Sequence, residues 1–260
     1  MIKTENAELY QVWLAEESCA RIHGWDFSHI EDRYEEEPLS WSYKEEIQKR
    51  LSPTARLLDT DTGGGEFLRA LAHPTSLTAA TENYPPNVAL CRETLLPLGV
   101  DFRAADAGRA LPFADNAFDM VLSRHGAYCA EELFRVLSPG GVFLTQQVGC
   151  DNDRALVELL LPGTPKPFPE QTPERMRQKF KGVGFQVTEL REEFPEIRFY
   201  DVGALVWFAR IIEWEFPGFS VDACAERLLC AQKILARDGV IRARTHRIFM
   251  AAEVRADGQY

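Results

Sequence analysis

The chain has 260 residues, of which 40 are acidic and 29 are basic, giving a formal net charge of −11 at pH 7. Such a surface disfavours nucleic acids and anionic membranes as general partners, because both attract positive charge. The hydrophobic fraction of 45% is ordinary for a globular protein, and the length fits one α/β domain with added elements.

No apolar run approaches the ~20 residues that a membrane-spanning helix needs. The first residues are polar and acidic and contain no apolar signal core, so we expect a cytoplasmic protein without membrane contact. The six cysteines form no C-x-x-C pair and no Cys/His cluster with zinc spacing. We therefore expect free thiols and a metal-independent protein.

Two amphipathic segments precede the first strand, at residues 4–21 and 41–51, and Pro53 ends the second. We expect residues 1–52 to form an N-terminal helical cap. Its aromatic residues have two open interpretations, since such side chains dominate both cores and pockets: packing onto the sheet or closing over a ligand. These residues are Trp25, Phe27, Trp41 and Tyr43.

The central feature is a short buried strand at Leu57 and Leu58, followed by a glycine-rich turn at 59–65 and a helix from Glu66. Glycines let a backbone turn sharply and approach a ligand closely. The simple pattern G-x-G-x-x-G fails, because Asp61 occupies the first glycine position, and no phosphate-binding P-loop motif is present.

Further strands are predicted from short apolar runs that alternate with helical segments and turns. They lie at 77–81, 100–104, 117–123, 142–148, 185–190 and 245–254, with a sharp turn at 138–141. This alternation predicts an α/β fold with a doubly wound, mostly parallel seven-stranded sheet and helices on both faces.

Acidic residues follow three of these strands, at Asp59, Glu82 and Asp106. In open α/β sheets, ligands bind outside the carboxyl ends of the strands. Glu82 follows Asp59 by 23 residues, where an acid would hold the two hydroxyls of a ribose. The alternative is an exposed glutamate favoured at a helix start.

These elements resemble class I S-adenosylmethionine-dependent methyltransferases in order and spacing. The resemblance covers residues 55–148 and rests on five motifs, which are 58–65, Glu82, Asp106-Ala107, 118–121 and 137–141. It implies a Rossmann-like fold and S-adenosylmethionine as cofactor. An NAD-dependent oxidoreductase fits less well, because the chain lacks a Tyr-x-x-x-Lys pair and a reason for the Pro-Gly-Gly turn.

The resemblance also implies roles for particular residues. The turn, with Asp59, Thr60, Asp61 and Gly63, would line the methionine part of the cofactor largely through backbone groups. Asp61 departs from the glycine usual in the family, and its carboxylate is a candidate partner for the cofactor's ammonium group.

The remaining implied contacts lie after the next strands. Glu82 would hold the ribose, Asn83 would lie beside the adenine, and Asp106 and Ala107 would meet the adenine edge. Ser123 and Arg124 would pass near the methionine part.

The second half adds helices at 151–161, 173–183 and 221–237, and its final strand is antiparallel in the resembled family. We expect a methyltransferase domain over 53–260 with a helical insertion at about 195–240. In small-molecule methyltransferases such insertions shape the acceptor pocket; the alternative is that it covers a sheet edge.

His125 is the candidate catalytic residue, because it follows the fourth strand and a neutral imidazole can accept the acceptor's proton. A packing role is the alternative, since methyl transfer is a direct displacement in which alignment supplies much of the rate. His246 is a weaker candidate.

The predicted function is methyl transfer to an O, N or C atom of a small molecule. Two alternatives stay open: a non-catalytic relative that binds the cofactor, and an RNA methyltransferase. The latter predicts an Asn/Asp-Pro-Pro-Tyr-like segment or a basic cleft, but residues 123–126 read Ser-Arg-His-Gly. The acceptor and the oligomeric state are not specified by these residues.

Overall fold

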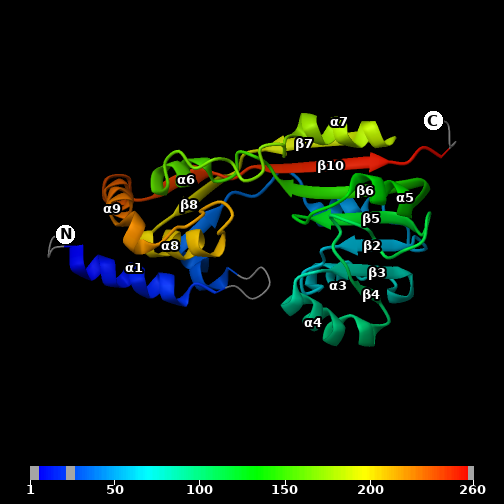
Figure 1. Ribbon diagram of the computed structural model, residues 1–260, viewed down its shortest axis with the longest axis horizontal. Helices are drawn as coiled ribbons and strands as arrows, with labels where there is room; N and C mark the ends of the chain where they lie inside the picture. The colour runs from blue at the N-terminus through cyan, green and yellow to red at the C-terminus, as the bar shows by residue number, and fades with distance from the viewer. Residues whose placement is uncertain (1–5, 22–26, 257–260) are drawn as a thin grey trace. The chain divides into compact units, whose positions relative to one another are not determined.

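The computed structural model describes residues 6–21 and 27–256, and its chain divides into two compact units (Figure 1). Unit 1 comprises Met1–Leu39, Cys150–Pro169 and Phe194–His246, and unit 2 comprises Ser40–Gly149, Glu170–Glu193 and Arg247–Tyr260. Each unit has its own hydrophobic core. Trp25 lies outside the described residues.

Unit 2 is built on a seven-stranded sheet in the order β4-β3-β2-β5-β6-β10-β7 (Figure 1). The strands are β2 (Leu57–Thr60), β3 (Thr78–Glu82), β4 (Asp101–Ala104), β5 (Phe118–Arg124), β6 (Leu137–Val148), β7 (Gln186–Glu193) and β10 (Arg247–Glu253). The strands from β4 to β6 pair in parallel, whereas β10 is antiparallel to both β6 and β7. The predicted mostly parallel sheet with an antiparallel last strand is confirmed.

Helices cover both faces of this sheet, because successive side chains of a strand point to opposite sides. Phe143 of β6 stacks on Phe180, whereas Phe249, which faces the other side, contacts Trp41 and Tyr43. The helices of unit 2 are α2 (Tyr43–Gln48), α3 (Glu66–Ala70), α4 (Pro85–Thr94), α5 (Ala130–Val136) and α7 (Pro173–Val183), with short 3-10 helices η3 (Thr75–Leu77) and η4 (Leu96–Leu98).

The turn predicted at 138–141 lies inside the bounds of β6. Gly140 has a φ of +79°, but its N–H donates to the carbonyl of Val254 at 2.8 Å. The bond keeps this stretch attached to the strand beside it, so the chain bends without leaving the sheet.

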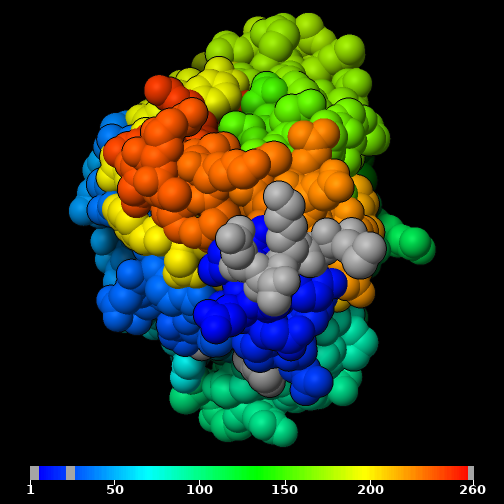
Figure 2. All heavy atoms as spheres, turned by 90° about the vertical axis from the view of Figure 1, so that its left-hand side faces the viewer, coloured from blue at the N-terminus to red at the C-terminus, as the bar shows by residue number. Residues whose placement is uncertain are grey.

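Unit 1 combines a three-stranded antiparallel sheet, in the order β1-β8-β9, with a helical layer. Its elements are α1 (Ala7–Cys19), η2 (Ser28–Arg33), β1 (Tyr34–Glu36), α6 (Arg154–Leu160), β8 (Glu196–Phe199), α8 (Val202–Ile211), α9 (Val221–Asp238) and β9 (Ile241–Arg244). Nearly every residue of α8 is buried, as expected of a helix that is apolar all round. Helices α1 (blue) and α9 (orange) lie side by side on the surface of this unit (Figure 2).

The compact units differ from the division expected from the sequence, a 1–52 cap and a 53–260 domain. Residues 40–52 belong to the sheet unit, and residues 150–169 join the first 39 residues in unit 1. The segment at about 195–240 contains strand β8 besides its helices. The four residues of β8 alternate between partly exposed and buried, a pattern too short to be recognised in the sequence.

Among helices of the described ranges, none combines the length and apolar character required to cross a membrane.

Gly65 tests how strongly the glycine turn constrains unit 2. It has a φ of +80°, and a Cβ there would lie 2.8 Å from Leu95 Cδ2. We expect Gly65→Ala to lower the free energy of unfolding by about 1–2 kcal/mol for the backbone and by about 1–3 kcal/mol more for the overpacking. Denaturant unfolding without ligand measures the loss.

Gly99→Ala is the matched control, because Gly99 has a φ of +87° and a Cβ there would approach nothing closer than 3.7 Å. Equal losses in the two variants would contradict the packing part of this explanation.

Candidate functional site

The candidate site lies at one edge of the sheet of unit 2, where β2, β3, β4 and β5 end. The register pairs Thr60 with Ser123 and Glu82 with Ala104, so these strand ends are level with one another. The polar residues that follow the strands therefore gather at a single edge. This is the ligand-binding position of open α/β sheets.

The glycine turn is shaped by an aspartate. Asp61 has a φ of +51°, a left-handed conformation that aspartate tolerates better than most residues. Its Oδ2 accepts a hydrogen bond from the Ala127 N–H at 2.9 Å. A Cβ on Gly126 would lie only 2.6 Å from Asp61 Cβ, so the glycine makes room for the aspartate. The side chain thus joins the turn to the loop after β5.

Glu82 connects the same turn to the end of β3. The residue is 4% exposed. Its Oε2 accepts from the Gly63 N–H at 2.8 Å, and its Oε1 accepts from the N–H groups of Asn83 and Tyr84 at 2.9 Å each. Its Oε2 also accepts a long hydrogen bond from Asn87 Nδ2 at 3.4 Å. Since a carboxylate has about four acceptor positions, a further donor would have to replace this weakest bond.

The carboxyl groups of Asp59 and Asp61, at the same edge, are costly to ionise. Burial raises the pKa of Asp59 to about 7, opposed by a hydrogen bond from Thr62 Oγ1 at 2.6 Å and assisted by repulsion from Asp61. Burial and repulsion from Glu82 raise the pKa of Asp61 to about 6. The buried Asp61 Oδ1 has no hydrogen-bond partner among the described residues. These groups leave negative charge uncompensated, which suits a cationic ligand.

The expected adenine contacts lie after β3 and β4. Asp106 is half-buried, accepts from the Gly108 N–H at 2.9 Å and pairs with Arg109 at 3.2 Å. Ala107 is buried, and Asn83 is exposed.

Thr60 and Arg124 differ in how free their side chains are. The Thr60 hydroxyl is fully buried and donates to the carbonyl of Leu122 at 2.9 Å, so its side chain serves the sheet. Arg124 is exposed, and its Cζ lies 5.3 Å from the ring centroid of Phe67. Its head group therefore already contacts an aromatic ring, but it is not buried in the sheet as the Thr60 hydroxyl is.

His125 is held in a left-handed backbone conformation with a φ of +60°. Its N–H donates to the Gln146 carbonyl at 2.8 Å, and its Nε2 lies 3.4 Å from Gln146 Nε2. Its Nδ1 is shielded from solvent and has no partner within the described ranges. Burial, with the nearby positive charges of Arg247 and Arg124, lowers its pKa to about 3. The imidazole is therefore neutral at physiological pH. His246 belongs to unit 1, where its Nδ1 accepts from the Asp151 N–H at 3.1 Å.

Trp41 and Tyr43 pack onto the sheet of unit 2. Trp41 Nε1 donates to Gln146 Oε1 at 3.0 Å, and the Tyr43 hydroxyl donates to the Leu144 carbonyl at 2.9 Å. Gln146 contacts both Trp41 and His125 and was not expected from the sequence. Its signal was the polar run Thr145-Gln146-Gln147 after the apolar start of a predicted strand. Phe27 packs against Trp207 in unit 1.

The comparisons agree with this geometry. Residues 58–145 match a family described as a methyltransferase domain. A phthiotriol/phenolphthiotriol dimycocerosates methyltransferase of Mycobacterium tuberculosis is 34% identical over 110 residues, which cover 40% of each chain. The protein of that name from Mycobacterium leprae is 34% identical over 86 residues, 30% of this chain and 31% of its own. The chain thus spans well under half the length of these curated relatives.

Solved structures share the fold. A putative methyltransferase from Bacillus halodurans has a TM-score of 0.58 at 18% identity and covers 82% of this chain and 98% of its own. The cyclase SpnF has a TM-score of 0.51 at 17% identity, and the match covers 98% of this chain and 95% of SpnF. Residues 58–145 thus match a methyltransferase domain, and these solved structures share the fold, which by itself does not fix the reaction.

The raised pKa of Asp61 leads to a prediction for the unliganded protein. An unfolded aspartate has a pKa of about 3.9, so the folded state holds the proton more tightly. The resulting stabilisation is complete at low pH and is lost as the pH rises through about 6. We expect Asp61→Asn to be more stable than wild type by about 1–2 kcal/mol at pH 8, after allowance for solvent screening, and equally stable near pH 4.

Thermal unfolding across this pH range measures the difference. Asparagine keeps the acceptor for Ala127 and tolerates the left-handed backbone. Asp32→Asn, at an exposed acid, is the control and should change nothing. A loss of stability in Asp61→Asn at pH 8 would contradict the assignment.

Proposed function

We propose that the chain, whose residues 58–145 match a methyltransferase domain, transfers a methyl group from S-adenosylmethionine to an O, N or C atom of a small molecule. The observation that carries this proposal is the set of acids at one sheet edge, with the buried, unpartnered Asp61 Oδ1 among them. Buried carboxylates without a cation are costly, so the edge favours a ligand that brings positive charge.

S-adenosylmethionine fits this requirement, because it carries a sulfonium and an ammonium group and supplies the methyl group when bound. We assign the ammonium to Asp61, whose free oxygen lies in the turn beside Gly63. Asp59, Thr60 and Gly63 would form the wall around the methionine part. Since the Thr60 hydroxyl is already bonded within the sheet, its share is limited to the backbone.

The nucleoside part has its own set of residues. Glu82 would accept hydrogen bonds from the ribose hydroxyls in place of the long bond that Asn87 Nδ2 donates to it. Asp106, Ala107 and Asn83 would surround the adenine, and Arg124 would lie near the methionine part.

His125 remains the proposed catalytic residue. With its pKa lowered to about 3, the imidazole is uncharged at working pH, and one of its two ring nitrogens is able to accept a proton. Such a weakly basic group accepts a proton late, as the acceptor atom gains positive charge. Its main contribution would then be to orient the acceptor through a hydrogen bond.

We propose that residues of unit 1 determine acceptor selectivity. The expected cap (1–52) and insertion (195–240) contribute most of this unit. It carries a groove of about 570 Å³, whose lining includes Leu156, Leu159, Ile234, Ile241, Arg227 and Arg242. Apolar walls with a few charged groups are typical of small-molecule sites. The six free cysteines support a reducing, cytoplasmic location.

The net charge of −11 disfavours the RNA alternative. A relative that binds the cofactor without turnover has the same acids, so a binding measurement must be followed by one of methyl transfer.

Calorimetric titration with S-adenosylhomocysteine tests the cofactor site. We expect wild type to bind one equivalent and Glu82→Gln to weaken binding by about 10–100-fold, since hydrogen bonds to charged groups contribute about 1.5–3 kcal/mol. Asp61→Asn should also weaken binding, because the amide cannot balance the ammonium charge.

Glu93→Gln, at an exposed acid of α4, is the control and should bind like wild type. Failure of a folded wild-type protein to bind would refute the cofactor assignment. Weaker binding in Asp61→Ala, but not in Asp61→Asn, would refute the charge role of Asp61.

His125→Ala tests the catalytic assignment. We expect kcat to fall by at least about 100-fold, the lower range for general acid–base groups, while the Kd for S-adenosylhomocysteine stays within about threefold. Transfer of a labelled methyl group to a panel of acceptors measures kcat. A parallel loss of cofactor affinity would show that His125 only packs beneath the cofactor.

A further inference from the structure

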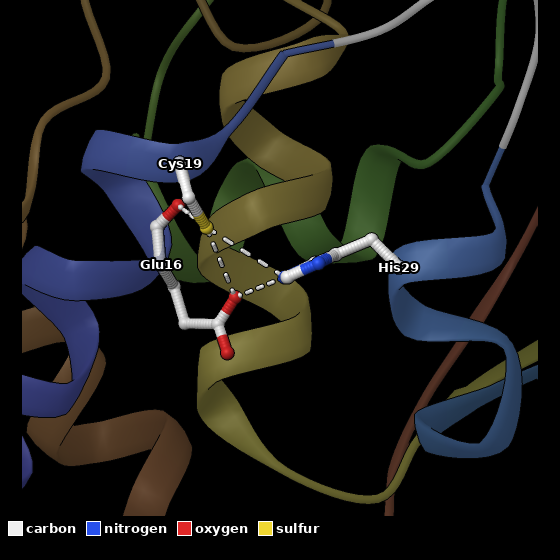
Figure 3. A group of neighbouring side chains, drawn as sticks. All are labelled: Glu16, Cys19 and His29. Carbon is white, nitrogen blue, oxygen red and sulfur yellow. Dashed lines mark hydrogen bonds and ion pairs between the residues drawn. The ribbon is translucent and has the colours of Figure 1, made fainter.

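Three different metal-binding side chains meet in unit 1, and none of them is assigned to the methyltransferase site. Glu16 and Cys19 come from the last turn of α1, and His29 comes from η2 (Figure 3). His29 Nε2 lies 2.8 Å from Glu16 Oε2 and 3.7 Å from Cys19 Sγ, and Cys19 Sγ lies 3.9 Å from the same carboxylate oxygen. The three donor atoms thus form one compact triangle.

The arrangement excludes a Cys-His-Glu proton relay. Such a relay uses both imidazole nitrogens, one toward the thiol and the other toward the acid. Here both the thiol and the carboxylate face Nε2. Donors that converge on one point are suited to sharing a cation at their centre.

We propose that Glu16, Cys19 and His29 bind a zinc ion. Zinc bonds of about 2.3 Å to sulfur and about 2.0–2.1 Å to nitrogen or oxygen, at tetrahedral angles, place sulfur about 3.6 Å from either lighter donor. The observed 3.7 and 3.9 Å meet this geometry within a few tenths of an ångström. The N–O separation of 2.8 Å must widen by about half an ångström toward the tetrahedral value.

The local charges support the site. Arg33 Nη1 bonds the other Glu16 oxygen, Oε1, at 2.7 Å, which leaves Oε2 to the triangle. The same guanidinium donates to both oxygens of Asp201 at 2.7 and 2.8 Å, so its charge is already offset. Arg33 therefore orients the carboxylate, as supporting residues do around metal ligands.

The imidazole is held in place from its other side. The ring of His29 stacks on Trp207, with centroids 5.4 Å apart and planes at 26°. The His29 side chain is 43% exposed, so an ion can enter from solvent. With three protein ligands, the fourth zinc position would be left to water, as in open zinc sites.

Zinc binding requires two proton movements. The S–H bond of Cys19 breaks, its proton passes to solvent, and the thiolate forms the bond to zinc. The hydrogen on His29 Nε2, which faces the Glu16 carboxylate, is exchanged through solvent for one on Nδ1, so that the neutral ring offers its Nε2 lone pair. Glu16 contributes its carboxylate, and no redox step occurs.

A second group, Cys150, Asp151 and His246, also gathers in unit 1 but is less suited to a cation. Lys166 Nζ lies 2.5 Å from Asp151 Oδ1 and 3.6 Å from Cys150 Sγ. His246 Nδ1 already accepts from the Asp151 N–H. An ammonium group therefore occupies the place that a metal would need.

Titration of the metal-free full chain with Co²⁺, a spectroscopic substitute for Zn²⁺, tests the proposal. We expect one equivalent to produce a thiolate-to-cobalt charge-transfer band, and one equivalent of Zn²⁺ to abolish it. Cys19→Ser should remove the band. Loss of a residue that only supports a metal ligand weakens metal binding by about 10–100-fold. His29→Gln removes a ligand itself, so it should weaken Co²⁺ binding by more than that.

Cys230→Ser is the matched control, because Cys230 is also exposed and lies in the same unit. It should leave the band and the affinity unchanged. Circular dichroism of each variant confirms folding, and substitution at His29 removes a ligand without changing any cysteine.

Two results would overturn the proposal. A folded wild type without the band would show that Glu16 and His29 form only an ion pair between α1 and η2. A band that persists in Cys19→Ser and disappears in Cys150→Ser would assign the metal to the second group.

Discussion

Repulsion among buried carboxylates is the constraint on which the ligand edge of unit 2 depends. Asp59 and Glu82 lie at the ends of two neighbouring parallel strands and Asp61 directly follows the first, so the sheet itself brings them together. Glu82 is stabilised by three backbone N–H groups, whereas Asp61 keeps one oxygen without a partner. The hydrogen bonds that satisfy Glu82 also set the shape of the turn. The hydrogen bonds to Glu82 therefore fix the backbone of the turn and also hold this negative charge beside Asp59 and Asp61.

Much of the fold could be predicted, because long apolar runs and glycine turns are local signals. The parallel strands, the antiparallel last strand and helices such as 173–183 follow from them. The small sheet of unit 1 was missed, since its strands have only three or four residues and lie far apart in the chain. The division into units was equally hidden, because it depends on three separate segments meeting around one core.

The site shows the same limit at the level of single residues. Asp59, Glu82 and Asp106 could be selected because strand ends are readable and an acid there has a known use. The hydrogen bond between Asp61 and Ala127 could not be predicted, because it joins residues 66 positions apart. It also depends on Gly126, whose role has no signature in the sequence. Zinc spacing rules likewise missed Glu16, Cys19 and His29, which meet only when η2 folds back on α1.

The charges of unit 2 also connect stability to ligand binding. Each carboxyl that is costly to ionise weakens the unliganded protein above its pKa, and a bound cation removes that cost. Under the proposed function, stability is given up at this edge and recovered when the cofactor binds, a common compromise at functional sites. Because Asp59 and Asp61 have pKa values of about 7 and about 6, the ligand's stabilising effect grows as the pH rises through this range. A turn with a purely structural role would not require these two carboxyl groups, since burying an asparagine at either position costs less free energy than burying an ionised aspartate.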